Sequence, residues 1–208
     1  MPALTLPRFD VHPGVAMVQK WVAELPAKTG RTFDQWTALV KRLKHPTAKE
    51  KRDHLKAEYG LGSVAAGWLV EAASGTATWD ADPDSYLRAA DGYVTAMYAG
   101  GKAHLFPIFE RLIDVGRSLG DDVTVCPCKT MVPLYRSRVF AEVKPTTRTR
   151  VDLSLALGEE PAQGVLTVNA QRAKKGDRLT HLIALHSSKD VTPEVKKWLK
   201  AAYTKVGE

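Results

Sequence analysis

The sequence of 208 residues is poor in cysteine, with only Cys126 and Cys128, and it lacks a long uncharged apolar run. Two cysteines separated by one proline supply no disulfide framework, so a reducing, cytoplasmic location is expected. A membrane span needs roughly 18 consecutive apolar residues. The most apolar segment, residues 64–70, is short and is followed by Glu71, and the first ten residues do not resemble a secretory signal. The sequence therefore predicts no membrane association.

The common local signatures of catalysis are also missing. There is no glycine-rich phosphate loop with a lysine and no serine elbow. His181 and His186 are five residues apart on one expected strand, so their side chains point to opposite faces. Cys126 and Cys128 offer only two soft metal ligands and are interpreted as structural cysteines. The sequence thus predicts no catalytic residue, no metal site and no cofactor, and it favours a non-catalytic protein.

The composition is that of an ordinary globular protein with a basic excess. Hydrophobic residues make up 44% of the chain, and 30 basic against 23 acidic residues give a net charge of +7. An excess of this size is compatible with binding to a polyanion. The distribution of the charge along the chain is therefore more informative than its total.

The first third of the chain has helical periodicity. Apolar residues from Val15 to Leu25 recur at helical spacing, and Pro26 is expected to end that helix. Thr32 and Thr47 each begin a capping box, and Ser63 is expected to cap a fourth helix. The sequence predicts a helical domain at residues 1–75 and a linker at residues 76–83, where every periodicity is broken.

The rest of the chain predicts an α+β domain at residues 84–208. Two helices are expected near residues 85–98 and 102–119, with Pro107 in a first turn or at a kink. A terminal helix is expected over residues 192–205. From Asp122 the apolar period changes to two, and alternation after Val151 indicates a sheet buried on one face. The expected strands are residues 123–126, 131–135, 139–143, 151–157, 165–168 and 179–186. The predicted fold class is α+β, with a small helical domain followed by an antiparallel sheet packed with helices.

The segment from Gly60 to Val70, Gly-Leu-Gly-Ser-Val-Ala-Ala-Gly-Trp-Leu-Val, resembles the second half of a helix-hairpin-helix motif. Two glycines allow a tight turn, and the following helix N-terminus presents free amides to an anion. Motifs of this kind hold a DNA phosphate without reading sequence. The resemblance makes Gly60, Leu61, Gly62, Ser63 and Val64 candidate contacts. The alternative is an ordinary junction in which one glycine ends a helix and a serine begins the next.

A basic cluster precedes this turn. Residues 41–56 carry seven lysines and arginines against two acidic residues, and such clusters bind phosphate through counterion release. A solvated helix face is the alternative explanation. The candidate contacts are Lys41, Arg42, Lys44, Lys49, Lys51, Arg52 and Lys56.

A second basic cluster depends on the topology of the sheet. In a simple meander, alternate turns lie at the same end of a sheet. The turns at Lys129, at residues 144–150 and at residues 172–178 would then form one basic rim, while Glu159 and Glu160 would lie at the opposite end. The candidate contacts are Lys144, Arg148, Arg150, Arg172, Lys174 and Lys175.

The chain as a whole resembles a bacterial architecture whose two halves are both families of unknown function. Residues 18–73 are similar to a small helical domain that opens with Lys28-Thr29-Gly30-Arg31-Thr32 and ends with the Gly-Leu-Gly turn. Residues 98–203 resemble an α+β domain of chains labelled "predicted transport protein", which also occurs next to nuclease-like proteins. The matching segments are Leu105-Phe106-Pro107-Ile108-Phe109-Glu110, Val139-Phe140-Ala141, Asp190-Val191 and Trp198-Leu199. The second half also looks distantly like frataxin-like iron chaperones.

These observations favour a cytoplasmic protein that binds DNA or RNA backbone without sequence specificity. The alternatives are a small-ligand or metal carrier that uses the α+β domain, and a module that binds a protein partner. An enzyme is the least favoured class. The sequence leaves the oligomeric state open.

Overall fold

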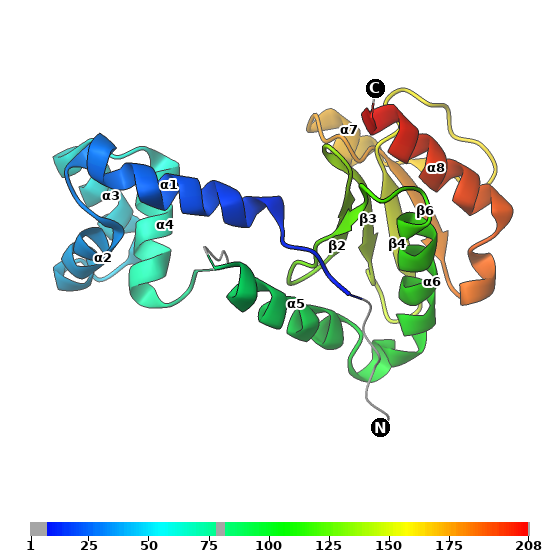
Figure 1. Ribbon diagram of the computed structural model, residues 1–208, viewed down its shortest axis with the longest axis horizontal. Helices are drawn as coiled ribbons and strands as arrows, with labels where there is room; N and C mark the ends of the chain where they lie inside the picture. Colours follow the sequence, from blue (N-terminus) through cyan, green and yellow to red (C-terminus); the bar gives the residue numbers. More distant parts are fainter. Residues whose placement is uncertain (1–7, 78–81, 208) are drawn as a thin grey trace. The chain divides into compact units, whose positions relative to one another are not determined.

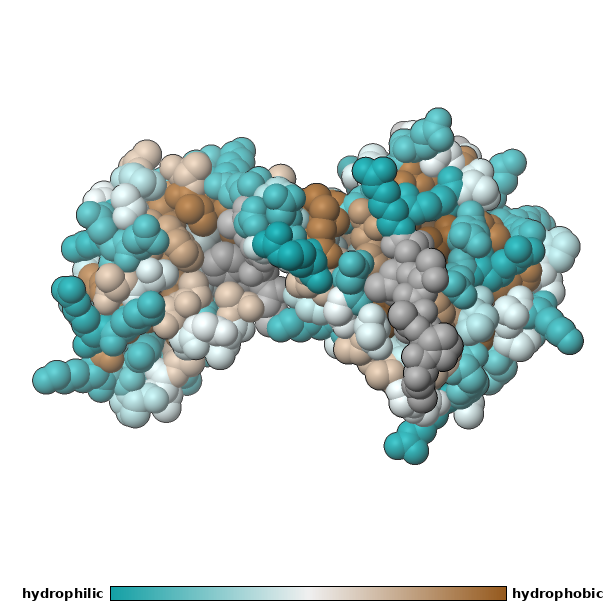
Figure 2. Space-filling view, turned by 60° about the horizontal axis from the view of Figure 1, so that its bottom comes forward, coloured by the Kyte–Doolittle hydropathy of each residue, from teal (hydrophilic) through white to brown (hydrophobic). Residues whose placement is uncertain are grey.

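The computed structural model describes residues 8–77 and 82–207, so the middle of the expected linker, residues 78–81, lies outside the described residues. The chain divides into two compact units: Pro13–Tyr86 form one, and the residues before and after them form the other. Among the described residues, no helix is long and apolar enough to span a bilayer. On the face seen in Figure 2, hydrophilic residues cover most of the surface and hydrophobic residues occupy only small areas.

The helical unit contains α1 (Pro13–Thr29), α2 (Phe33–Arg42), α3 (Ala48–Tyr59) and α4 (Ser63–Ser74). Both expected capping boxes are present, because Thr32 and Thr47 each exchange hydrogen bonds with the residue three positions later. The prediction that Pro26 ends the first helix is wrong. The proline ring removes one hydrogen bond of the helix and crowds the carbonyl four residues earlier, yet α1 continues to Thr29, and the amide of Gly30 donates to the carbonyl of Pro26 at 2.9 Å.

The other unit has the predicted α+β fold, with α6 and α8 on the same side of the sheet (Figure 1). Pro107 lies in the first turn of α6, where a proline is tolerated. The helical elements are α5 (Pro83–Met97), which begins in the helical unit and enters this one at Leu87, η1 (Gly100–Leu105), α6 (Phe106–Arg117), α7 (Ala170–Lys174), η2 (Ser188–Asp190) and α8 (Pro193–Gly207). The strands are β1 (Thr124–Val125), β2 (Val132–Tyr135), β3 (Val139–Lys144), β4 (Val151–Leu155), β5 (Thr167–Val168) and β6 (His181–Leu185).

The six strands form one sheet in the order β1-β2-β3-β4-β6-β5, with every neighbouring pair antiparallel. The expected meander is therefore wrong beyond β4. The last long strand, β6, pairs with β4, and the short strand β5 pairs with β6 at the edge. Because β5 and β4 are both antiparallel to β6, they run in the same direction. The connection between β5 and β6 consequently lies at the opposite end of the sheet from the connection between β3 and β4.

The sheet is buried on both faces, whereas the alternation along β4 predicted that only one face would be buried. All five residues of β4 are buried, and its two polar members, Asp152 and Ser154, are only 8% and 5% exposed. Arg172 of α7 covers this second face, since its guanidinium donates to Ser154 Oγ at 3.2 Å and to both carboxylate oxygens of Glu142 at 3.3 Å. Arg150 neutralises Asp152 at 2.7 Å. The arginines therefore make it possible to bury polar side chains on the second face of the sheet. Hydrophobic periodicity alone cannot predict such pairing.

Residues 8–12 pack with the α+β unit. The amide of Asp10 donates to the carbonyl of Val125 at 2.9 Å, and the amide of Val125 returns a hydrogen bond to the Asp10 carboxylate at 2.8 Å. Arg117 of α6 also contacts this carboxylate at 2.8 Å. The segment thus lies against the edge of the sheet at β1 and ties it to α6.

Candidate nucleic-acid interface

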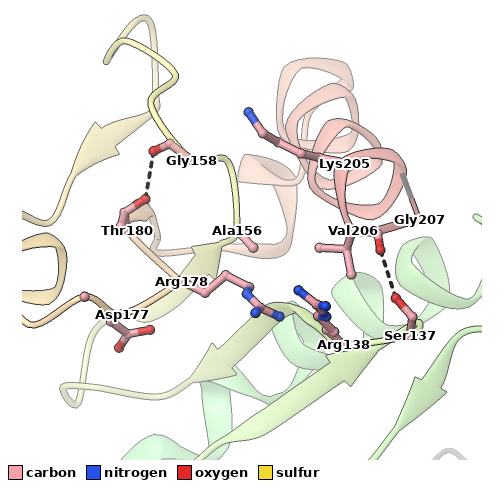
Figure 3. A pocket seen from close by; sticks show the side chains of 11 residues that line it. Ser137, Arg138, Ala156, Gly158, Asp177, Arg178, Thr180, Lys205, Val206 and Gly207 are labelled. Carbon is pink, nitrogen blue, oxygen red and sulfur yellow. Dashed lines mark hydrogen bonds between the residues drawn. The ribbon is translucent and has the colours of Figure 1, made fainter.

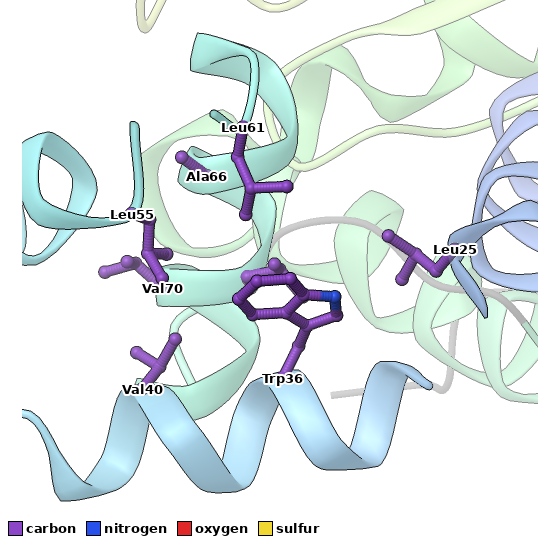
Figure 4. Close-up of a cluster of buried hydrophobic side chains, with 8 residues drawn as sticks. Leu25, Trp36, Val40, Leu55, Leu61, Ala66 and Val70 are labelled. Carbon is purple, nitrogen blue, oxygen red and sulfur yellow. The ribbon is translucent and has the colours of Figure 1, made fainter. Parts of the chain in front are cut away.

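The turn between α3 and α4 is a tight helical hairpin. Gly60 takes the left-handed conformation with φ of 65°, which suits a residue without a Cβ, and its amide caps the end of α3. Leu61 and Ala66 are buried in a core with Trp36, Leu55 and other apolar residues of the unit (Figure 4). Their burial fixes the turn against the core while Gly62 remains exposed.

The N-terminus of α4 begins one residue earlier than predicted. Gly62, not Ser63, is the N-cap, and Ser63 is the first residue of the helix, so the expected serine cap is wrong. Gly62 has ordinary extended torsion angles and provides no side chain to accept from the first amides of the helix. Both Ser63 and Val64 are exposed, Val64 by 65%. The first turn of α4 therefore offers uncapped backbone donors at the surface, the chemical requirement for holding a phosphate oxygen.

The basic cluster of residues 41–56 is spread over the unit, and most of it does not lie at the hairpin. A helix rises about 1.5 Å per residue, so Arg52 is about 12 Å along α3 from the turn at Gly60. Its side chain lies along α4, because its Cδ is 3.9 Å from the position that a β-carbon at Gly67 would take. Lys49 is paired with Asp53 at 2.8 Å. Lys41 and Arg42 end α2, Lys44 follows that helix, Lys49, Lys51 and Arg52 lie in the first half of α3, and Lys56 lies in its last turn.

Sequence reasoning missed a cation and an aromatic ring beside the hairpin. The guanidinium of Arg31 lies 5.2 Å from the ring centre of Tyr59, the residue before Gly60, and 5.0 Å from that of Trp36. Such cation–π contacts hold a guanidinium in place while its edge remains able to donate hydrogen bonds. The signal available in the sequence was Arg31 in the opening motif of the helical domain, which the charge count of residues 41–56 left out.

The sheet separates the residues of the expected basic rim. Lys129, Lys144 and Arg148 do lie at one end, which we call the Lys144 end, because β1 and β3 both run toward it. The segment with Arg172, Lys174 and Lys175 lies at the other end, which we call the Arg138 end after the turn between β2 and β3. Glu159 and Glu160 follow β4 and lie at the Arg138 end too. The predicted basic rim is therefore wrong for residues 172–178, whereas Glu159 and Glu160 lie at the end opposite Lys144, as predicted.

The Lys144 end carries a basic hollow of about 560 Å³, here called the Lys144 pocket. Its cations are Lys102, Lys129, Lys144 and Arg148, and none of its lining residues, all within the described part of the chain, is acidic. Lys102 Nζ donates to the carbonyl of Pro145 at 2.6 Å, which fixes this ammonium beside the turn between β3 and β4. Sequence reasoning missed Lys102 because it stands alone in η1, far from the other three along the chain.

Two predicted contacts of this region are engaged within the protein. Arg150 pairs with the Asp152 carboxylate: its Nε lies 2.7 Å from one oxygen, and its Nη2 donates to the other at 3.2 Å. Arg172 is held by Glu142, Ser154 and Asp177. Lys174 and Lys175 are exposed on and after α7. The Lys144 pocket thus retains Lys144 and Arg148 from the predicted set.

The two cysteines are free thiols in a setting that disfavours reactivity. Burial raises the pKa of the Cys126 thiol to about 12, and burial followed by the charge of Glu142 raises the pKa of Cys128. Within the described residues, no group of three or more histidine, cysteine or acidic side chains could hold a metal ion. His181 is buried, and its Nε2 is 2.7 Å from the carbonyl of Glu160.

Comparison with known protein families divides the chain into two parts. Residues 17–74 match the family described as Domain of unknown function (DUF4287). Residues 94–205 match the family described as Domain of unknown function (DUF5655). No curated protein and no solved structure matches the chain. The second match spans more than half of the 208 residues, so the protein belongs to the DUF5655 family, with a DUF4287-like helical domain before it.

Proposed function

We propose that the protein binds the phosphate backbone of nucleic acid without sequence specificity. The observation that carries the proposal is the Lys144 pocket, in which four cations from three separate segments meet without an acidic neighbour in the lining. Unpaired cations brought together by a fold repel one another, and an anionic partner relieves that repulsion. Contacts to phosphate are sequence-independent, and lysine and arginine are their usual donors.

The helical unit supports the same function through its hairpin. The uncapped first turn of α4 would hold one phosphate through its backbone amides, as in helix-hairpin-helix motifs. Val64 and Ala65 stand where such motifs often carry a lysine or arginine. Positive charge near the turn comes instead from Arg31, which lies over the ring of Tyr59, and from Lys56 in the last turn of α3. Each unit would thus contribute its own backbone contact.

The proposal keeps the expected cytoplasmic location. Nucleic acid is present there, and the reducing conditions are compatible with the free thiols of Cys126 and Cys128.

The experiment compares binding of labelled duplex DNA, single-stranded DNA and RNA, by fluorescence anisotropy at about 50 mM salt, where backbone contacts are strong. The double variant Lys144→Gln/Arg148→Gln should weaken binding about tenfold or more. The matched control is Lys174→Gln/Lys175→Gln, which removes the same charge from exposed positions at the Arg138 end. Equal loss in both double variants would show that only net charge matters and would contradict the Lys144 pocket as the contact surface.

The hairpin has its own variant. Gly62→Glu places a negative charge at the first turn of α4, where Gly62 has compatible torsion angles and nothing within 4 Å of a built β-carbon. The variant should fold as the wild type does, since an acidic residue at a helix N-terminus is favourable. Weaker binding by the folded variant supports the hairpin contact, and unchanged binding removes the hairpin from the proposal.

A further inference from the structure

A second hollow, of about 730 Å³, opens at the Arg138 end of the sheet and is here called the Arg138 pocket (Figure 3). Four segments that are distant in sequence line it: the turn between β2 and β3, the residues after β4, the connection between β5 and β6, and the last turn of α8. Its cations are Arg138, Arg178 and Lys205, and Ala156 and Val206 provide apolar lining.

The two arginines point toward one another across the pocket (Figure 3). Within the described residues, neither guanidinium has a hydrogen-bond or ion-pair partner. Lys205 Nζ donates to the carbonyl of Leu157 at 2.8 Å, which uses one of its three N–H donors. Asp177 is the one acidic residue among the described residues of the lining, and its carboxylate is already occupied by Arg172 at 2.6 Å. The pocket therefore gathers positive charge that no carboxylate among residues 8–77 and 82–207 neutralises.

Hydrogen bonds fix the segments that carry these arginines. The amide of Arg136 donates to the carbonyl of Arg138 at 3.0 Å and closes the turn between β2 and β3. Ser137 Oγ donates to the carbonyl of Val206 at 2.8 Å and ties this turn to α8. The other arginine follows Asp177, whose carboxylate accepts from the amide of Leu179 at 3.0 Å. Both guanidinium groups therefore project from anchored backbone.

We infer that the Arg138 pocket binds a small molecule with a phosphoryl group. Two guanidinium groups match a dianion in charge, and a tetrahedral phosphate has enough oxygens to bridge both, whereas one arginine already satisfies a carboxylate. The volume lies within the range of small-molecule sites and exceeds the needs of a bare phosphate. The remaining part of the ligand lies against Ala156 and Val206.

The surroundings of the pocket separate it from a surface for a polymer. Glu159 and Glu160 directly follow the lining residue Gly158, and they would repel a polyanion that passes along this end of the sheet. A small ligand held between the arginines avoids them. Among the described residues, none that lines the Lys144 pocket is acidic, and the two ends of the sheet therefore suit different anions.

The test is an NMR titration of the full chain with phenyl phosphate, which joins a phosphate dianion to a small apolar ring. Inorganic phosphate and benzoate are the comparison probes. We expect binding with a dissociation constant of about 1 mM or tighter, with amide shifts at Gly158, Gly176 and Thr180, and weaker binding of both comparison probes. Arg138→Gln and Arg178→Gln should each weaken phenyl phosphate binding about tenfold, and Arg148→Gln, the control at the Lys144 end, should leave it unchanged.

Four results of the titration would overturn the inference. The first is that phenyl phosphate does not bind at millimolar concentration, and the second is that Arg138→Gln and Arg178→Gln both bind it as the wild type does. The third is that Arg148→Gln weakens phenyl phosphate binding as much as they do, and the fourth is that benzoate binds as tightly as phenyl phosphate. Nucleic-acid binding by the same variants keeps this inference distinct from the proposed function. That binding should respond to Arg148→Gln and not to Arg138→Gln. If Arg138→Gln weakens nucleic-acid binding, the Arg138 pocket is part of the nucleic-acid contact surface, and a separate small-molecule site is contradicted.

Discussion

Arg172 of α7 and Glu142 of β3 form a two-point ion pair on the face of the sheet opposite α6 and α8, with both N–O distances at 3.3 Å. Glu142 is only 7% exposed, and the ion pair offsets the cost of burying its carboxylate. The same guanidinium also contacts Ser154 and Asp177. One side chain thus fastens α7 to the sheet and satisfies the polar groups beneath it.

Removing that side chain should destabilise the protein more than its partial exposure suggests. Arg172→Ala leaves Glu142 buried and unpaired, and we expect the free energy of unfolding to fall by about 2 kcal/mol. Lys174→Ala, on the same short helix, removes an exposed charge and should change the free energy of unfolding by less than about 0.5 kcal/mol. Urea denaturation followed by circular dichroism measures both. Equal effects would mean that the ion pair contributes nothing beyond surface charge.

The attachment of α7 should also weaken in acid. Burial raises the pKa of Asp177, but the Leu179 amide and the Arg172 guanidinium lower it more, so the net pKa lies below the ordinary value. A group with a lowered folded-state pKa stabilises the protein above its unfolded-state pKa, near 4, and loses that effect as the pH falls through the folded value. Wild type should therefore be more stable than Asp177→Asn at pH 6, and the difference should shrink below about pH 4. A difference that does not change with pH would contradict this assignment.

Most elements of the fold could be predicted from the sequence, but the short helix α7 and the order of the strands could not. Period-two alternation located all six strands, and the capping boxes at Thr32 and Thr47 located two helix starts. The choice of partner for β6 depends on contacts between distant residues, such as the pairing of Leu153 with Ile183. No local pattern in the sequence predicts that pairing. The assumption of a simple meander consequently placed residues 172–178 at the wrong end of the sheet.

Close packing between α6 and β2 gives a prediction at Gly116. A β-carbon at this position would overlap the side chain of Leu134. Gly116→Ala should therefore lower the free energy of unfolding by about 1–3 kcal/mol. Gly92→Ala is the matched control, because Gly92 lies within α5 with nothing within 4 Å of a built β-carbon, and alanine there should stabilise by about 0.5–1 kcal/mol. Thermal denaturation should shift in opposite directions, and shifts in the same direction would contradict the packing.

The buried thiol of Cys126 should resist alkylation in the folded protein. Its pKa of about 12 leaves almost no thiolate at pH 8, and the thiolate is the species that reacts. Iodoacetamide at pH 8 should label Cys126 far more slowly than a free cysteine, and at a normal rate once urea unfolds the chain. Mass spectrometry of the digested protein reports the labelled site. Rapid labelling of the folded protein would contradict a buried, structural cysteine.

The candidate sites were less accessible to sequence reasoning than the fold. Clusters that are contiguous in sequence, such as residues 41–56, were found, yet they are spread along two helices. The two pockets instead collect single cations, such as Lys102, Arg138 and Lys205, from segments that only the folded chain brings together. Arg150 and Arg172 were expected at a surface contact, but carboxylates on the same sheet occupy them. Charge in a sequence does not disclose whether it is already paired.

The salt dependence of duplex DNA binding by the wild-type protein tests the central claim most directly. If the four cations of the Lys144 pocket each neutralise one phosphate, they should contribute about −3.6 to the slope of log K against log salt. Affinity would then fall about 100-fold between 50 and 200 mM salt. The double variant Lys144→Gln/Arg148→Gln should reduce the slope by about 2. No binding at 50 mM salt, or an affinity that does not change with salt, would contradict binding of the phosphate backbone.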